Sequence, residues 1–230
     1  MRGNFSRLIR AVVRGETDAV SRMLANSPDL ATMHSAKGAT RRNAADWFFV
    51  EIAHYMVAGD TALHMAAAAF HRSAAESLIR HGASCRARNR RGAEPLHYAA
   101  DANRWEPDAQ KDTIEYLLAV GADPNALDKS GVSPLHRAVR TRASEAVRAL
   151  LAGGAEVRSP NRNGSTALHL AVQDTGRSGA GSARARNEQA KIIAILLDAG
   201  ARATDTDSKG KSVLEISAND RIRLLLKHAR

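Results

Sequence analysis

Four histidines recur at one position of a short motif, and imidazole serves proteins both as a metal ligand and as a general base. They are His64, His97, His136 and His169. Two other stretches carry residue types used in chemistry. Glu51 and His54 lie close together, and Gly210-Lys211-Ser212 matches the end of a phosphate-binding loop.

None of these stretches completes a catalytic signature. The segment with Glu51 and His54 has no second histidine at the spacing of a zinc-binding helix, and Asp205 stands where a phosphate loop needs its first glycine. A nucleophile elbow and a cysteine–histidine signature are also missing from the sequence. We therefore expect no enzyme, no cofactor and no metal site.

The histidine motif repeats along the chain. "TALHMAA" (61–67) returns as "EPLHYAA" (94–100), "SPLHRAV" (133–139) and "TALHLAV" (166–172), and more weakly as "SVLEISA" (212–218). The central leucines are spaced by 33, 39, 33 and 46 residues. The base period is therefore 33 residues, and two of the units contain insertions.

Each unit reads as two helices. A Thr or Ser opens the first helix in most copies, and Pro takes its first position in two of them. The second helix ends at a glycine, where a left-handed residue is needed: Gly82, Gly121, Gly154 and Gly200. One helix pair cannot bury its own apolar face, so the units must stack. Stacking separates equivalent histidines by about 10 Å, which argues against a shared metal.

This two-part motif resembles that of the ankyrin-repeat family, and the likeness covers most of the chain, in the manner of a bacterial-type ankyrin-repeat domain protein with insertions. The resemblance implies an all-α solenoid of stacked helix-turn-helix units joined by β-hairpin-like fingers. It also implies that the motif histidines are structural and form hydrogen bonds around the helix start and to the adjacent unit.

We expect a single domain over residues 1–230, with about six units of which the two terminal ones are degenerate caps. The predicted divisions are an N-terminal cap (1–31), an insertion (32–58), four repeats (59–89, 90–127, 128–160 and 161–206) and a C-terminal cap (207–230). Two smaller insertions, 102–112 and 174–189, fall between the helices of a unit. Trp105, in the first of them, is expected to pack onto a neighbouring helix; an exposed anchor is the alternative.

Residues 46–58 hold four of the nine aromatic residues: Trp47, Phe48, Phe49 and Tyr55. The segment is compatible with a helix that is apolar nearly all round, which favours an extra helix buried between the cap and the solenoid. The alternative is an aromatic patch that binds a partner, with Tyr55 and Phe49 as its first candidates.

The resemblance further implies that partners dock on the concave surface, which the fingers and the exposed sides of the first helices form. The corresponding positions in this sequence are Arg90, Arg91, Ala93, Asp101, Lys129, Ser130, Val132, Arg137, Arg140, Thr141, Arg162, Asn163, Ser165, Gln173, Asp174 and Lys209.

The chain carries 34 Lys and Arg against 24 Asp and Glu, a net charge of +10. A row of arginines suits the carboxylates of an acidic protein partner, and it would equally suit phosphates. We therefore expect a non-catalytic protein-binding module, with binding of a polyanion or nucleic acid as the alternative. The single cysteine, Cys85, and the lack of a signal peptide or apolar span predict a soluble, cytoplasmic protein, which we expect to be monomeric.

Overall fold

The structure is a computed structural model, and it describes residues 2–101, 105–173, 182–217 and 219–228. Within those ranges, twelve α-helices follow one another in pairs. The pairs are α1 (Arg2–Val13) with α2 (Thr17–Asn26), α3 (Ala62–Ala68) with α4 (Arg72–Arg80), α5 (Pro95–Ala99) with α6 (Pro107–Ala119), α7 (Pro134–Arg140) with α8 (Ser144–Ala152), α9 (Ala167–Ala171) with α10 (Ala183–Asp198), and α11 (Val213–Ile216) with α12 (Asp220–His228).

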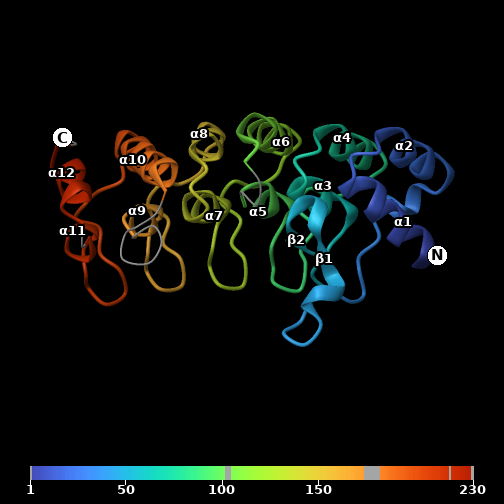
Figure 1. The fold of residues 1–230 in the computed structure, drawn as a ribbon, viewed down its shortest axis with the longest axis horizontal. Coiled ribbons are helices and arrows are strands. Elements are labelled where there is room, and N and C mark those ends of the chain that lie inside the picture. Colours follow the sequence, from blue (N-terminus) through green and yellow to red (C-terminus); the bar gives the residue numbers. More distant parts are fainter. Residues whose placement is uncertain (1, 102–104, 174–181, 218, 229–230) are drawn as a thin grey trace.

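The pairs stack side by side into an elongated solenoid (Figure 1). The first helix of each pair lies in one layer and the second helix in another, and the connecting fingers project from the edge next to the first helices. The two ends of the chain lie at opposite ends of the stack. The expected helical solenoid is thus confirmed, and no helix in the described ranges is long and apolar enough to cross a membrane.

The first helices begin at the predicted capping residues. The hydroxyl of Thr61 accepts a hydrogen bond from the backbone N–H of His64, whose ring Nδ1 in turn accepts from the N–H of Thr61. Such a reciprocal pair satisfies donors that a helix start otherwise leaves free. The same box recurs at the starts of α5, α7 and α9, and at α11 with a glutamate in place of histidine.

The glycines that follow the second helices adopt the predicted left-handed conformation. The φ angles of Gly82, Gly121, Gly154 and Gly200 lie between +90° and +97°. Residues with a Cβ rarely tolerate this backbone, so the repeated glycine fixes where each second helix ends.

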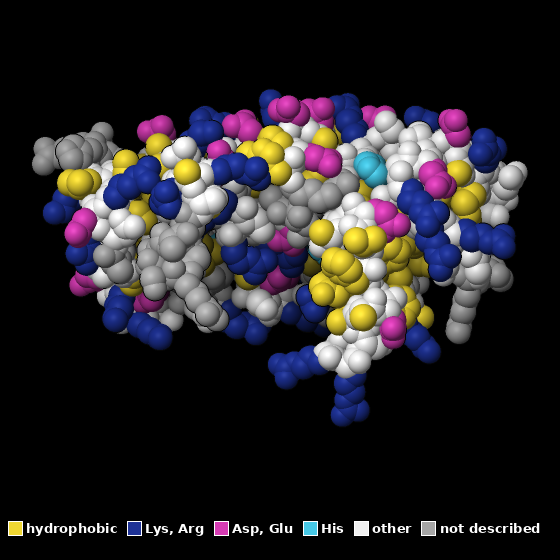
Figure 2. Space-filling view, viewed as in Figure 1, with side chains coloured by type: hydrophobic (Ala, Val, Ile, Leu, Met, Phe, Trp, Pro, Cys, Tyr) yellow, Lys and Arg dark blue, Asp and Glu magenta, His cyan; other side chains and the backbone are white. Residues whose placement is uncertain are grey.

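The aromatic segment is not the α-helix that its apolar pattern suggested. It forms two 3₁₀ turns, Ala44–Trp47 and Val50–Ile52, and a hairpin in which β1 (Phe48–Phe49) pairs antiparallel with β2 (His54–Tyr55). Backbone hydrogen bonds between the two arms of the hairpin replace helical ones: the Met56 N–H, for example, donates to the Trp47 carbonyl at 2.9 Å. Apolar side chains gather on the front of this projecting insertion (Figure 2).

Burial explains why the helix prediction was wrong. Ile52, Met56 and Val57 are buried, whereas the side chains of Phe48, Val50 and Tyr55 remain exposed. The segment therefore has one buried side and one exposed side, which a short hairpin provides and a helix buried all round does not. A further 3₁₀ turn, Pro28–Ala31, connects α2 to the insertion.

The two smaller insertions were expected between the helices of a pair, but only their first parts lie there. The second helices begin inside them, α6 at Pro107 and α10 at Ala183, and residues 102–104 and 174–181 lie outside the described ranges. Trp105 is 45% exposed, and the guanidinium carbon of Arg184 lies 3.8 Å from the centroid of its ring. One face of Trp105 thus packs on a cation of helix α10, as the packing interpretation expected, while the rest of the ring stays exposed.

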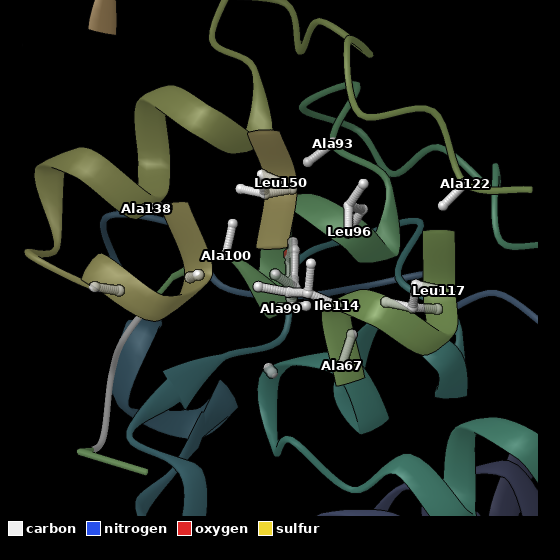
Figure 3. Close-up of a cluster of buried hydrophobic side chains, with 14 of the residues drawn as sticks. Ala67, Ala93, Leu96, Ala99, Ala100, Ile114, Leu117, Ala122, Ala138 and Leu150 are labelled. Atoms are coloured by element: carbon white, nitrogen blue, oxygen red, sulfur yellow. The ribbon is translucent and has the colours of Figure 1, made fainter. Parts of the chain in front are cut away.

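One continuous core runs through the stack. The motif leucines Leu63, Leu96, Leu135 and Leu168 expose 1% or less of their surface. Figure 3 shows how a unit meets its neighbours: Leu96 and Ala99 of α5 lie with Ile114 and Leu117 of α6, and Ala67 and Ala138 come from the adjacent first helices. Each unit is therefore stabilised by burial against the next.

Candidate partner-binding groove

A groove of about 1000 Å³ opens between the insertion and the fingers. The insertion forms one wall, and the finger residues 89–93 and 128–132 form the other. The lining is completed by Tyr98 and Asp101 from the α5 region and by Arg137 and Arg140 of α7. A concave surface of this size is a default place to look for binding.

One polar side chain holds the shape of each finger. The side-chain oxygen Oδ1 of Asn89 accepts from the backbone N–H groups of Arg91 and Ala93, at 2.8 and 3.1 Å. Asp128 does the same for its finger, with Ser130 and Val132 as donors, and Asn161 and Asp207 repeat the pattern further along. The finger shape is therefore encoded locally in every unit.

Backbone bonds tie neighbouring fingers together. The N–H of Lys129 donates to the carbonyl of Arg91 at 2.9 Å, and that of Arg90 donates to the carbonyl of Ala58 at 2.8 Å. Gly131 allows such close approach, because a Cβ on it would lie 2.7 Å from the backbone nitrogen of Arg162. The fingers thus form a continuous, preorganised surface rather than separate loops.

The insertion is fastened to this surface through Arg90, and close contacts hold its own two arms together. The Arg90 guanidinium donates to the carbonyl of Ala39 at 3.3 Å, and the Ala39 N–H donates to the carbonyl of Met56 at 2.8 Å. Gly38 packs so closely on Val57 and Ala58 that a Cβ there would overlap their backbone. The wall of the groove is therefore a fixed part of the fold.

A buried polar network lies behind the groove. The carboxylate of Asp60, which is fully buried, accepts from the Asn89 amide at 2.8 Å and from the Tyr98 hydroxyl at 3.0 Å. Burial, followed by the nearby Asp60 carboxylate, raises the pKa of the Tyr98 phenol. The ring of Tyr98 in turn stacks with that of His54 of the insertion, with centroids 4.5 Å apart. This network joins the insertion to the second and third helix pairs.

Arg137 forms an ion cluster at the base of the groove. Its guanidinium lies 2.7 Å from a carboxylate oxygen of Asp101 and 3.1 Å from one of Asp128, and all three side chains are at most 12% exposed. Burial alone would raise the pKa of Asp128, but N–H donors from Val132 and Ser130, together with Arg137, lower it. The positive charge of Arg137 is therefore paired with two buried carboxylates of the protein itself.

The other cations on the lining point to solvent. Arg41, Arg90, Arg91, Lys129 and Arg140 are all exposed. Arg140 is 63% exposed, and its contact with Asp101 is longer, at 3.4 Å. Lys and Arg side chains are also seen where the fingers end and at the tip of the insertion (Figure 2). The groove thus presents five exposed cations, while its two carboxylates are paired with Arg137.

The structure brings only part of the residue set expected from sequence into this groove. Arg90, Arg91, Lys129, Ser130, Val132 and Arg140 line it with solvent-accessible side chains. Ala93 and Asp101 line it but are buried, and Arg137 is largely covered.

The remaining expected residues lie elsewhere. Thr141 is half-buried and its hydroxyl donates to the carbonyl of Arg137. Arg162, Asn163, Ser165, Gln173 and Lys209 belong to later units and do not line the groove, and Asp174 is outside the described residues.

Sequence reasoning did not place Arg41 and His54 at the groove. The wall that holds them is an insertion, so no repeated position pointed to it. Two features of the sequence pointed to it. One is the Arg41-Arg42 pair, which lies in a turn closed by a hydrogen bond from Thr40 to Asn43, and the other is Tyr55, the alternative partner contact, which directly follows His54.

The motif histidines are bound to the backbone of the next unit. Nε2 of His64, His97 and His136 lies 3.1, 3.0 and 3.1 Å from the carbonyls of Ala93, Val132 and Ser165, respectively. The structural role is confirmed for these three. His169 forms its helix-start bonds, but its buried Nε2 has no partner among the described residues. In the same part of the chain, no group of three or more His, Cys, Asp or Glu side chains is placed to hold a metal.

Comparison with known proteins identifies one recurring similarity. The family model described as "Ankyrin repeats (3 copies)" matches residues 8–126 and 107–180. The chain is 37% identical over 87 residues to the E3 ubiquitin-protein ligase KEG of Arabidopsis thaliana, and 41% identical over 51 residues to a putative ankyrin repeat protein, FPV022, of Fowlpox virus. These matches cover 38% and 22% of the chain but only 5% and 8% of the two relatives.

Proposed function

The chain belongs to the ankyrin-repeat family, and from this premise we propose that it is a non-catalytic module that binds a partner protein with an acidic surface. Ankyrin repeats are in general protein–protein interaction modules, and their domains are typically non-catalytic. We further propose six repeat units, with the terminal two acting as caps, in a monomeric protein of the cytoplasm.

One observation supports the acidic partner: five exposed cations converge on a single groove, and both carboxylates on its lining contact Arg137. Asp128 pairs with Arg137, and Asp101 pairs with both Arg137 and Arg140, so the two acids have cationic partners within the protein and the lining keeps an excess of positive charge. Exposed guanidinium groups can bind carboxylates in a bidentate manner, which gives both attraction and orientation.

A polyanion is the second candidate, because the same five cations would attract phosphates. The two candidates differ in their dependence on salt. Binding to nucleic acid weakens steeply as salt is added, since it is driven by counterion release. Binding to an acidic protein retains the part of the affinity that comes from apolar contacts.

The test compares two triple charge reversals. The groove variant combines Arg91→Glu, Lys129→Glu and Arg140→Glu, and leaves Arg90 in place because its guanidinium holds the insertion. Its matched control combines Arg22→Glu, Arg148→Glu and Lys227→Glu, which change the net charge equally on exposed residues of α2, α8 and α12. Both proteins should melt close to the wild type, because exposed charges contribute about 0–1 kcal/mol each.

Affinity capture from nuclease-treated native lysate, followed by measurement of the captured protein's Kd, then gives the result. We expect a protein that the wild type and the control retain and the groove variant loses. Equal retention by both variants would refute the groove as the binding surface. Material that is captured from an untreated lysate but not from the nuclease-treated one would favour the polyanion instead.

A further inference from the structure

We propose that the groove binds an extended segment of the partner in which acidic residues flank one aromatic side chain, and that Tyr55 of the insertion is the residue that selects the aromatic. This inference rests on the proposed function and specifies what the partner presents. It also gives the insertion a role, as the wall that converts an open concave face into a groove.

The polar side chains of Asn89 and Tyr98 on the groove lining are already engaged. Both ends of the Asn89 amide are used, by the Asp60 carboxylate and by the finger N–H groups. The Tyr98 hydroxyl donates to Asp60. A ligand group that reaches this region therefore meets engaged polar groups, so contacts there favour an apolar side chain over a charged one.

Tyr55 supplies the apolar surface. It is 45% exposed, lines the groove, and is backed by the ring of its cross-strand partner Phe48, with centroids 4.8 Å apart. The half-buried side chains of His54 and Val132 lie on the same lining. A backed aromatic ring loses little freedom on binding, and such residues often dominate the affinity of an interface.

The rims supply the charge. Arg41 stands on the insertion side, and Lys129 and Arg140 stand on the finger and helix side. Cations on both rims, with an apolar surface between them, match a chain that carries acids on either side of an aromatic residue. A groove of about 1000 Å³ is at the upper end of the range for ligand sites and has room for a short extended segment.

The same arrangement is a poorer match for single-stranded nucleic acid. Such ligands need successive aromatic platforms, one for each stacked base, along a continuous cationic track. Here the exposed ring on the described lining is that of Tyr55, with Phe48 behind it, which makes one aromatic cluster rather than a series of platforms.

The wall is rigid before the ligand arrives. The Arg90–Ala39 hydrogen bond and the His54–Tyr98 stack fix the insertion against the repeats, and the close approach of Gly38 to Val57 and Ala58 holds the two arms of the insertion together. A preformed groove avoids part of the entropy that binding otherwise costs. Tyr55 is therefore placed as a specificity-determining contact rather than as a loose surface residue.

The experiment is a double-mutant cycle between protein and peptide. The probe is a fluorescein-labelled nine-residue peptide with two glutamates on each side of a central phenylalanine. Companion peptides replace the phenylalanine with alanine or the glutamates with glutamines. The protein variants are Tyr55→Ala, the conservative Tyr55→Phe, and Trp105→Ala as the matched control, since Trp105 is also 45% exposed but does not line the groove.

We expect Tyr55→Ala to weaken binding of the phenylalanine peptide about tenfold, while Tyr55→Phe and Trp105→Ala bind like the wild type. The alanine peptide should bind all four proteins with similar, weaker affinity, which shows that Tyr55 and the phenylalanine interact. The glutamine peptide should not bind. Circular dichroism melting curves confirm that each variant is folded.

Three results would overturn the inference. The first is no binding of the peptide to the wild type, the second is Tyr55→Ala binding as tightly as the wild type, and the third is displacement of the peptide by a much lower concentration of oligothymidylate than of unlabelled peptide. The proposed function fails differently, by retention of the lysate partner in the groove charge-reversal variant. If the peptide binds only when it carries glutamates, but Tyr55→Ala does not weaken the binding of the phenylalanine peptide, the proposed function stands and only this inference is refuted.

Discussion

His97 shows how a single residue joins two units. Its Nδ1 accepts from the N–H of Glu94 at the helix start, and its Nε2 donates to the carbonyl of Val132 in the next unit. Both bonds are formed by a neutral ring. Burial, helped by the nearby charge of Arg137, lowers the pKa of His97 to about 4. Folding therefore requires an uncharged imidazole at this position.

This requirement predicts a loss of stability in mild acid. The unfolded state takes up a proton below its pKa of about 6.5, whereas the folded state does so only near 4, so the stabilisation is complete above about pH 6.5 and falls as the pH drops toward 4. Between pH 6.5 and 5 we expect His97 to account for about 1–2 kcal/mol of lost unfolding free energy. Urea titrations at the two pH values check this, with His97→Gln as the comparison. A decrease just as large in His97→Gln would contradict the assignment.

Arg137 and Arg140 lie one turn apart on α7 but differ in what they do. Arg137 is paired with two buried carboxylates, whereas Arg140 is mostly in water. Removing Arg137 leaves both acids without their main counter-charge in a region of low solvent access, and such losses typically cost about 3–5 kcal/mol.

The prediction is that Arg137→Met lowers the unfolding free energy by about 3–5 kcal/mol, and that the matched variant Arg140→Met lowers it by less than about 1 kcal/mol. Guanidinium or urea denaturation followed by circular dichroism measures both. Similar stability of the two variants would show that the ion cluster is not important for folding. Affinity for the acidic peptide, corrected for the folded fraction, should fall more in Arg140→Met than in Arg137→Met, because Arg140 is the exposed cation.

At the scale of elements, the first helices act as the links of the stack. They are short, five to seven residues in α3, α5, α7 and α9, and would not be stable alone. Their stability comes from a capping box at one end and from burial of the motif leucine between neighbouring units. The insertion hairpin is different, because it is held on one side only and leaves aromatic rings exposed.

Leu135 tests the role of the first helices as links. It lies in α7 and is 1% exposed, so Leu135→Ala should open a cavity between units and cost about 2–5 kcal/mol. Leu127, in the preceding finger, is 41% exposed, and Leu127→Ala should cost less than about 1 kcal/mol. Denaturant titration of both variants is the measurement. A cost under about 1 kcal/mol for Leu135→Ala would mean that the assigned phase of the repeat is wrong.

At the scale of the whole molecule, a regular stack carries one irregular piece. The repeats alone would present a long, shallow face with cations on successive fingers. The insertion lies beside the first two of these fingers and encloses the groove there, and this is where we propose that the partner binds. The net charge of +10 favours encounter with acidic molecules in general, and under this proposal the groove adds the shape that selects among them.

Much of this molecule could be predicted from the sequence because its main signals are local and repeated. The leucine at each motif, the glycine after each second helix and the Thr–His pair at a helix start depend only on the unit itself and its neighbour. A stack of such units then follows, since each must bury its apolar face against the next. The repeat positions of Arg90, Arg91, Lys129 and Arg140 likewise predict their place on the concave side.

Only the tertiary structure decided what the irregular parts do. Residues 46–58 have no repeat to serve as a template, and their apolar pattern fits a helix as well as a hairpin; contacts of Ile52 and Met56 with the core settled the choice. Arg137 looks like any other finger-side cation in the sequence, because its partners Asp101 and Asp128 are 36 and 9 residues away. Charge pairing and packing between distant residues depend on the folded path of the chain, and no local pattern in the sequence records that path.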